Sequence, residues 1–227
     1  MRQKVFSIII AGVVLLSSLA YGYSGGSGTS ENPYKIADVN DLLELGGTIA
    51  DYDKCFILTA DINMGGQVFT TAIIPETPGG WGFTGTFDGN GHKITNSIIN
   101  GGDSEVGLFG QIRDGTVKNL GVENFSVRSS SPHDFYHAGC MVGRNQGILS
   151  NCYSIGDVNS TNVAGGLVGT NSGGTISNCY SMGQVIGASG GSFHYVGGLA
   201  GVNSGDISDC CSMVSVSGVA VMLHLAM

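Results

Sequence analysis

Histidines and aromatic residues gather in two segments of the chain, and these residue types are suited to contact a ligand. Both segments interrupt a regular pattern and contain several serines, so we expect them to be loops that carry exposed rings. Exposed aromatic side chains on loops are typical of contact surfaces for sugars or proteins. We predict six ligand-binding residues, with an extracellular glycan or a surface protein as partner: Phe135, Tyr136, His137, Phe193, His194 and Tyr195.

The pair His133 and His137 has a spacing that would bring two imidazoles to one metal ion if the segment were helical. The segment reads as a loop instead, and no pair of cysteines has the two-residue spacing typical of zinc sites. We therefore predict neither a metal site nor a cofactor.

Catalysis of the kind that polysaccharide lyases and hydrolases perform needs acidic residues, with Arg or Lys, clustered on one face. Six residues are candidates for such a cluster: Asp88, His92, Asp103, Glu105, Arg113 and Asp114. Asp88 and His92 bracket an Asp-Gly-Asn-Gly turn, which explains them by backbone preference. The rest of the chain is poor in acids and bases, and its serines have no recurrent histidine for a triad. We predict no catalytic residues.

Three of the six cysteines, Cys152, Cys179 and Cys210, occupy the same slot in successive repeats, where the preceding repeat has Leu120. A position that accepts Leu or Cys is typically an interior apolar position. We therefore predict a ladder of interior thiols. Export to an oxidising compartment leaves a disulfide pair as the alternative.

The repeats themselves consist of Gly-Leu-Val-Gly followed by Asn-Cys-Tyr-Ser. The equivalent glycines Gly110, Gly143, Gly169 and Gly201 are separated by 33, 26 and 32 residues, so the unit is near 26 residues. Each unit has three short strands, and stacked units can build a continuous core. This pattern predicts an all-β fold, a right-handed parallel β-helix (solenoid) with a short N-terminal capping helix. An antiparallel sandwich or a propeller is the alternative, although a propeller blade needs about 40 residues.

An asparagine recurs beside the cysteine in each repeat, at Asn119, Asn151 and Asn178, with Asp209 in the fourth. Asn tolerates the left-handed backbone conformation that a corner between strands requires. Its side chain can also hydrogen-bond along a stack of identical residues. We predict that these residues and the thiols form structural ladders rather than a site.

The N-terminal part supplies the expected cap. Asp38 is a plausible helix N-cap, the helix continues to Leu45, and Gly46-Gly47 end it. A short amphipathic helix here would cover the first coil of the solenoid, which is otherwise open to water.

Residues 1–20 have the features of a signal peptide, with Arg2 and Lys4 before an apolar run from Val5 to Leu19. That run is short for a membrane span, which needs about 20 residues, and an uncleaved anchor is the alternative. Membrane contact is expected only through this segment. Residues 21–32 read as a flexible leader, and residues 219–227 as an atypical or truncated tail. The net charge of −8 makes nucleic acid a poor partner.

The block Gly-Gly-Leu-Val-Gly-x-Asn-Ser-Gly-Gly-Thr-Ile-Ser-Asn-Cys-Tyr-Ser-x-Gly-x-Val, residues 165–185, resembles the GLUG motif repeat of exported bacterial surface proteins. The resemblance implies GLUG-type repeats over residues 105–218, preceded by an N-terminal cap and first coils over residues 33–104. In such adhesin-like proteins the repeats form stalks or binding surfaces, and catalysis lies in separate domains. The fourth repeat departs from the motif with Asp209, Cys211 and Val214.

Taken together, these features predict a secreted or cell-surface β-helical module for adhesion, surface structure or ligand binding, without catalysis. The alternative is a fragment of a carbohydrate-active enzyme, a polysaccharide lyase or hydrolase on the same fold. Carboxylates that converge in one groove would favour the enzyme.

Overall fold

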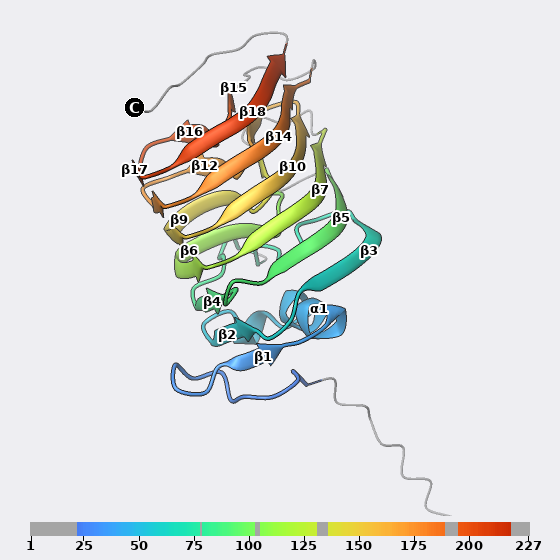
Figure 1. Ribbon diagram of the computed structural model, residues 1–227, viewed down its shortest axis with the longest axis vertical. Helices are drawn as coiled ribbons and strands as arrows, with labels where there is room; N and C mark the ends of the chain where they lie inside the picture. The colour runs from blue at the N-terminus through green and yellow to red at the C-terminus, as the bar shows by residue number, and fades with distance from the viewer. Residues whose placement is uncertain (1–21, 78, 103–104, 131–135, 189–194, 219–227) are drawn as a thin grey trace, which may run out of the picture.

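The computed structural model describes residues 22–77, 79–102, 105–130, 136–188 and 195–218. The expected signal peptide and C-terminal tail therefore lie outside the described residues, as do Phe135, Phe193 and His194. Within those ranges the chain winds into stacked coils, and every strand pairing is parallel (Figure 1). The predicted all-β parallel β-helix with one N-terminal helix is confirmed.

One wall of the solenoid is a six-stranded sheet that runs through six successive coils, from teal to red in Figure 1. Its strands are β3 (Ile62–Phe69), β5 (Lys93–Gly101), β7 (Gly121–Ser129), β10 (Tyr153–Ser160), β14 (Tyr180–Gly187) and β18 (Cys211–Gly218). In register, equivalent residues of successive repeats lie side by side, such as Val158 beside Val185. The sequence period is therefore the length of one coil.

The other walls are a nine-stranded and a three-stranded sheet. The larger contains β1 (Tyr34–Ile36), β2 (Cys55–Leu58), β4 (Thr86–Asp88), β6 (Phe109–Lys118), β9 (Val142–Ser150), β12 (Val168–Asn171), β13 (Thr175–Ser177), β16 (Ala200–Asn203) and β17 (Asp206–Ser208). The smaller contains β8 (His137–Gly139), β11 (Val163–Gly165) and β15 (Tyr195–Gly197). The two long insertions connect β7 to β8 and β14 to β15, so both of them join the six-stranded sheet to the three-stranded sheet.

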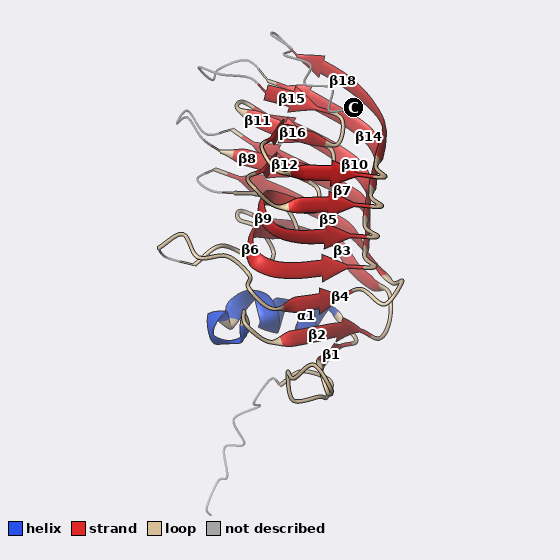
Figure 2. Ribbon diagram, turned by 90° about the vertical axis from the view of Figure 1, so that its left-hand side faces the viewer, coloured by secondary structure: helices blue, strands red, loops and turns tan. Residues whose placement is uncertain are grey.

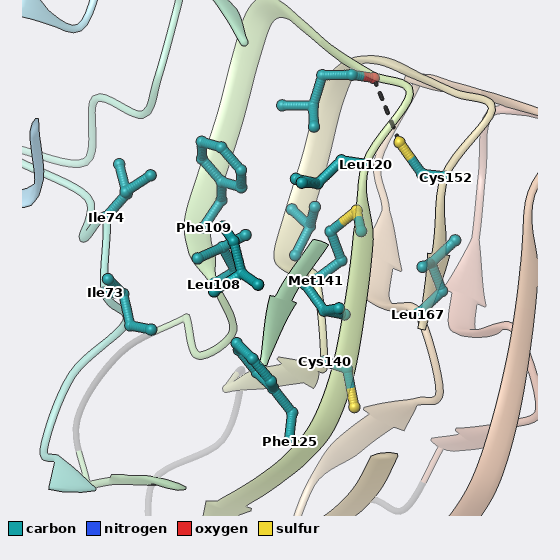
Figure 3. Packing of buried hydrophobic residues seen from close by; sticks show 14 of the residues in the cluster. Ile73, Ile74, Leu108, Phe109, Leu120, Phe125, Cys140, Met141, Cys152 and Leu167 are labelled. Atoms are coloured by element: carbon teal, nitrogen blue, oxygen red, sulfur yellow. Dashed lines mark hydrogen bonds between the residues drawn. The ribbon is translucent and has the colours of Figure 1, made fainter. Parts of the chain in front are cut away.

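In the core between the walls, apolar side chains from successive coils stack in columns, one above another. Phe87 of β4 pairs with Phe56 below it and Val117 above it, and Leu149 and Ile176 continue the column. All five side chains are buried. A second set comes from the Gly-Leu-Val-Gly segments, and Figure 3 shows Leu108, Met141 and Leu167 within it. Burial of these ladders supplies the hydrophobic stabilisation that a single coil lacks.

The second glycine of each Gly-Leu-Val-Gly segment lies where no side chain fits. A Cβ on Gly143 would approach the Gly110 carbonyl oxygen to 2.7 Å and Glu105 Cβ to 2.8 Å. One on Gly201 would come within 2.7 Å of Val163 Cγ1. Neighbouring backbone therefore packs directly on this column of glycines, including that of Ala138 and Ala164 in the three-stranded sheet.

Near the N-terminal end of the stack, α1 (Val39–Gly47) packs against β1 and β3 at the level of β2 and β4, and a short 3-10 turn, η1 (Ile49–Asp51), follows it (Figure 2). The Asp38 side chain caps the helix by accepting hydrogen bonds from the backbone N–H groups of Asn40 and Asp41, at 2.8 and 3.1 Å. Leu42 and Leu45, on the inner face of this helix, are fully buried. The helix has the place and the capping residue expected from the sequence.

Residues 22–32 differ from the flexible leader that the sequence suggested, because they fold back on the first coil. The backbone N–H of Lys35 donates to the Gly25 carbonyl at 2.7 Å, and that of Cys55 to the Gly28 carbonyl at 2.9 Å. The Tyr23 ring packs on Tyr34, with ring centroids 4.4 Å apart. Glycines here serve turns with positive φ, including Gly28 at 75°, and the aromatic contact supplies the burial that orders the segment.

Candidate functional site

Of the six predicted ligand-binding residues, Tyr136, His137 and Tyr195 lie within the described part of the chain. His137 begins β8 and Tyr195 begins β15, and Val163 of β11 lies between them in register. The fold therefore brings His137 and Tyr195 into one column, two coils or about 10 Å apart. Tyr136 and Tyr195 are half-buried.

His137 has a buried partner that sequence reasoning did not identify. Its Nδ1 lies 2.7 Å from Glu105 Oε2 and 2.9 Å from Oε1, and both residues are more than nine-tenths buried. The backbone N–H of Val106 donates to the His137 carbonyl, which places Glu105 one coil below His137. Glu105 and His137 are 32 residues apart, which is the length of one coil plus its insertion. No local sequence pattern therefore reveals that they pair.

Glu76 and Arg144 complete a charged cluster around this pair. Burial, followed by the negative charge of Glu105, raises the pKa of Glu76, while the charges of Arg144 and His137 oppose the shift. Arg144 Nη2 is 3.5 Å from Ser172 Oγ, and Arg144 Nε is buried without a hydrogen-bond partner. We call Glu76, Glu105, His137 and Arg144 the corner cluster.

A pocket of about 380 Å³ opens at the carboxyl ends of β5, β7 and β10. It is lined by Asn100, Gly101, Gly102, Arg128, Ser129, Ser130, Asn159, Thr161 and Ala188. Ser130 directly follows β7 and Ala188 directly follows β14, so the pocket lies at the root of both insertions. We refer to it as the insertion-root pocket.

Arg128 is the charged residue of this pocket, and it is exposed. Asn100 lies beside it in the coil below and Asn159 in the coil above, because these three residues are strand partners. No carboxylate lines the pocket, and none within the described residues forms an ion pair with Arg128. The site therefore offers guanidinium, amide and hydroxyl groups to a ligand rich in oxygen.

Sequence reasoning missed this pocket, although a signal for it was present. Asn100, Arg128, Asn159 and Ile186 occupy one register position in four successive coils. A single Arg among uncharged residues at an outward position is visible once the coils are aligned. The position lies beyond the recurrent Gly and Asn-Cys blocks of each repeat.

The predicted ladder residues occupy two columns at the corner between the nine-stranded and six-stranded sheets. Asn119, Asn151, Asn178 and Asp209 all have positive φ, between 52° and 53°. Asn151 Nδ2 donates to Asn119 Oδ1 at 3.1 Å, and Asn119 Nδ2 donates to Asp88 Oδ1 at 3.0 Å. These side chains stabilise a corner and are not arranged around a ligand.

The thiols of Cys152 and Cys179 are buried and that of Cys210 is partly buried, and all three are free. Each thiol is directed to a backbone carbonyl: Cys152 Sγ lies 3.2 Å from the Ser150 oxygen and 3.8 Å from that of Val117 (Figure 3). Burial is also the main reason that the pKa of Cys152 is raised. A buried, protonated thiol such as that of Cys152 is a poor nucleophile and a poor metal ligand, whereas hydrogen bonding with Cys152 lowers the pKa of the neighbouring Cys179 thiol.

A second asparagine ladder, inside the solenoid, was not predicted. Asn145 and Asn171 are fully buried. Asn145 Nδ2 donates to Asn171 Oδ1, and Asn171 Nδ2 donates to Asn203 Oδ1, each at 2.8 Å. Each amide also donates to the backbone carbonyl of a following glycine. The recurrence of Asn before Gly was a visible signal, but Asn is more often exposed than buried.

The acidic residues considered for catalysis lie apart, with local partners. Asp88 accepts from the backbone N–H of Asn90 at 2.8 Å, as expected for a turn residue. His92 Nδ1 lies 3.0 Å from Asp61, and the Arg113 guanidinium lies 4.1 Å from the centre of the Trp81 ring. Asp103 lies outside the described residues. Within the described ranges no three His, Cys, Asp or Glu residues are placed to hold a metal ion.

The helix content of the described chain is small, and none of it has the length and apolar character needed to cross a membrane.

Comparison with known proteins agrees with the repeat pattern. Residues 160–186 match the GLUG motif, which confirms the resemblance seen in the sequence. Halomucin of Haloquadratum walsbyi is 33% identical over 155 residues, which is 64% of this chain and 2% of halomucin. A protein provisionally named a Gly-rich membrane protein, from Evansella cellulosilytica, is 31% identical over 139 residues, 57% of this chain and 15% of its own length. The chain thus spans a small part of each of these relatives.

Among solved structures, a protein from Bacteroides ovatus described provisionally as an immunoglobulin A1 protease is similar in fold. The match covers 89% of this chain and 87% of that chain, with a TM-score of 0.52 and 19% identity. At this identity the likeness concerns the solenoid fold alone.

Proposed function

We propose that this GLUG-motif solenoid is a secreted or cell-surface module that binds an extracellular ligand at the insertion-root pocket, without catalysis. The observation that carries the proposal is the pocket itself. It combines a guanidinium that has no ion-pair partner among the described residues with amide and hydroxyl groups at the root of both insertions. Loops that a rigid scaffold holds in place commonly carry binding residues. The aromatic residues predicted for ligand contact belong to the same two insertions.

A saccharide suits the pocket better than a protein surface does. The lining contains Asn, Ser and Thr but no apolar side chain larger than that of Ala188. Protein interfaces depend on buried aromatic or aliphatic anchors, and those need apolar walls. The volume of about 380 Å³ lies at the lower end of the range for small-molecule sites, roughly 300–1,000 Å³.

The proposal is tested by filling the pocket without disturbing the fold. Gly102 lines the pocket, and a Cβ there would meet no atom within 4 Å. Gly102→Trp should therefore abolish binding on a glycan array while preserving the thermal unfolding midpoint. The matched control is Gly47→Trp, at a remote position in α1 that is equally open. Equal binding by both variants would exclude the pocket as the site. Failure of the unaltered protein to bind any glycan on the array would refute saccharide binding.

The corner cluster carries a second candidate function, a carbohydrate-active enzyme. Two carboxylates, Glu76 and Glu105, lie close enough for the charge of Glu105 to raise the pKa of Glu76. A carboxyl with a raised pKa beside an ionised one is the arrangement that glycoside hydrolysis uses. Against it, Glu105 is held by His137 on both oxygens and is buried. Release of reducing ends from a panel of polysaccharides, lost in Glu76→Gln, would establish the enzyme in place of the binding module.

A further inference from the structure

We propose that the insertion-root pocket takes a saccharide that carries a carboxylate, with Arg128 binding the carboxylate and the flanking asparagines binding ring hydroxyls. The inference rests on the proposed function and specifies the ligand class of the same site.

Arg128 differs from several other cations in having no acidic or aromatic partner in the described part of the chain. Three other cations of the described chain are engaged: Lys93 Nζ lies 2.9 Å from Glu123, Lys118 Nζ lies 3.3 Å from Asp88, and Arg113 lies over a Trp ring. Arg128 has no such partner in the described residues and lines a concave site. In a protein of net charge −8, this leaves a local positive site that attracts one anionic group.

The flat shape of the Arg128 guanidinium favours a carboxylate as its partner. Its planar array of N–H donors matches the two oxygens of a carboxylate, and such bidentate pairs are both strong and orienting. A carboxylate bound at Arg128 would place the rest of its sugar ring across the neighbouring coils. Strand spacing puts Asn100 and Asn159 about 4.8 Å below and above Arg128, so that one of them lies on each side of a group bound there.

The amide side chains on either side of Arg128 suit the hydroxyl groups of a sugar. Each amide side chain both donates and accepts, as a sugar hydroxyl does. Asn100 and Asn159 both line the pocket, and neither amide side chain forms a hydrogen bond with another residue in the described part of the chain. Gly101 and Gly102 leave the space beside them open.

Other anions suit the site less well. Nucleic acid and polyphosphate binding depends on several cations that each neutralise a phosphate, and this pocket has a single one. A sulfate ester has one charge but three terminal oxygens, which the flat guanidinium engages only in part. A planar carboxylate next to neutral hydroxyls is the best match to one Arg between two Asn.

The test measures the affinity of the whole protein for matched acidic and neutral saccharides by isothermal titration calorimetry. The acidic probes are a glucuronic-acid disaccharide and sialyllactose, which carry the carboxylate on different sugars. The neutral probes are the corresponding glucose disaccharide and lactose, and a sulfated lactose forms a further arm. We expect both acidic probes to bind at least about tenfold more tightly than their neutral partners, the equivalent of one charge-assisted hydrogen-bonded pair. If only one acidic probe binds, the sugar that carries the carboxylate is thereby identified.

Arg128→Gln should remove this preference and leave the weaker binding of the neutral probes unchanged. The matched control is Lys35→Gln, which makes the same change in net charge outside the pocket and should preserve the preference. Arg128→Lys keeps the charge but not the fork of donors, and we expect it to retain only part of the preference.

The outcomes separate the two proposals. Equal affinity for acidic and neutral probes, or a preference that survives Arg128→Gln, overturns the carboxylate inference and leaves saccharide binding intact. Tighter binding of sulfated lactose than of both carboxylates also overturns it. Absence of binding to every probe, together with a blank glycan array, removes the proposed function itself.

Discussion

The buried asparagine ladder inside the solenoid should be a major source of its stability, and Asn171 is the residue to change. Asn171 Oδ1 accepts from Asn145 Nδ2, and its own Nδ2 donates to Asn203 Oδ1 and to the Gly174 carbonyl. Asn171→Ala removes all three hydrogen bonds. At about 0.5–1.5 kcal/mol each, with a small cavity added, the loss in free energy of unfolding should be about 2–4 kcal/mol.

The expected loss in free energy of unfolding is no larger because Asn145 and Asn203 keep other hydrogen-bond partners in the variant. Asn145 Nδ2 still donates to the Gly147 carbonyl at 3.3 Å, and Asn203 Nδ2 to the Gly205 carbonyl at 3.0 Å. No amide group is therefore left entirely without a hydrogen bond. A larger loss would mean that the ladder acts cooperatively along the stack.

The measurement is urea unfolding followed by far-ultraviolet circular dichroism, with the slope of the transition compared between variants. The control is Asn151→Gly, because Asn151 is exposed and its φ of 52° is one that Gly adopts freely. Its cost should stay below about 1 kcal/mol. A loss in Asn171→Ala no greater than that of the control, at an unchanged slope, would show that the interior ladder contributes nothing.

Asn171→Asp provides a second readout of the same ladder. The new carboxyl would be buried, so its pKa in the folded protein should be raised above its value in the unfolded chain. A group with a raised folded pKa stabilises at low pH, and this contribution is lost as the pH rises. The destabilisation relative to the unaltered protein should therefore grow from acidic to neutral pH. A pH-independent difference would argue against burial of the side chain at position 171.

Three further predictions follow from packing and charge. Gly143→Ala forces a methyl group against the preceding coil and should cost about 1–3 kcal/mol in urea unfolding, whereas Gly47→Ala, which meets no atom, should cost nothing; equal effects would contradict the packing. The pKa of Glu76 is raised by burial and a neighbouring carboxylate, so it destabilises the fold increasingly as the pH rises; Glu76→Gln should raise the unfolding temperature more at pH 7 than at pH 4, and the reverse order would disprove the sign. Alkylation at pH 8 followed by mass spectrometry should modify exposed Cys211 first and spare Cys140, whose pKa burial raises to about 12, until the protein unfolds.

The overall fold was predictable because its determinants repeat. Gly at a crowded position, apolar residues in the core and Asn at a left-handed corner recur once per coil, and each type has a physical reason that holds in every coil. Asn151 and Asn178, for example, have the same φ of 52°. A single repeat would be ambiguous, whereas four aligned repeats leave little choice of architecture.

Contacts that occur only once were harder to predict. The Glu105–His137 pair joins two coils across an insertion, and its members have no counterparts in the repeats that follow, where Val163 and Tyr195 take the place of His137. The order of residues 22–32 likewise depends on Tyr23 packing against Phe56 of another strand. Both contacts depend on residues distant in sequence, which composition and local spacing do not reveal.

The same contrast indicates where a solenoid can hold a ligand site. A residue that recurs in every coil, such as the Asn-Cys pair, serves stacking, because each copy must fit the one above and below. A site needs a position at which the side chain can differ from coil to coil without breaking the ladder. The outward position at the ends of β5, β7 and β10 meets that condition, with Asn100, Arg128 and Asn159 in turn. Recognition by this chain should therefore depend on such non-repeating positions beside the insertions, and exchanging Arg128 with Asn159 should alter the position of the bound ligand without altering stability.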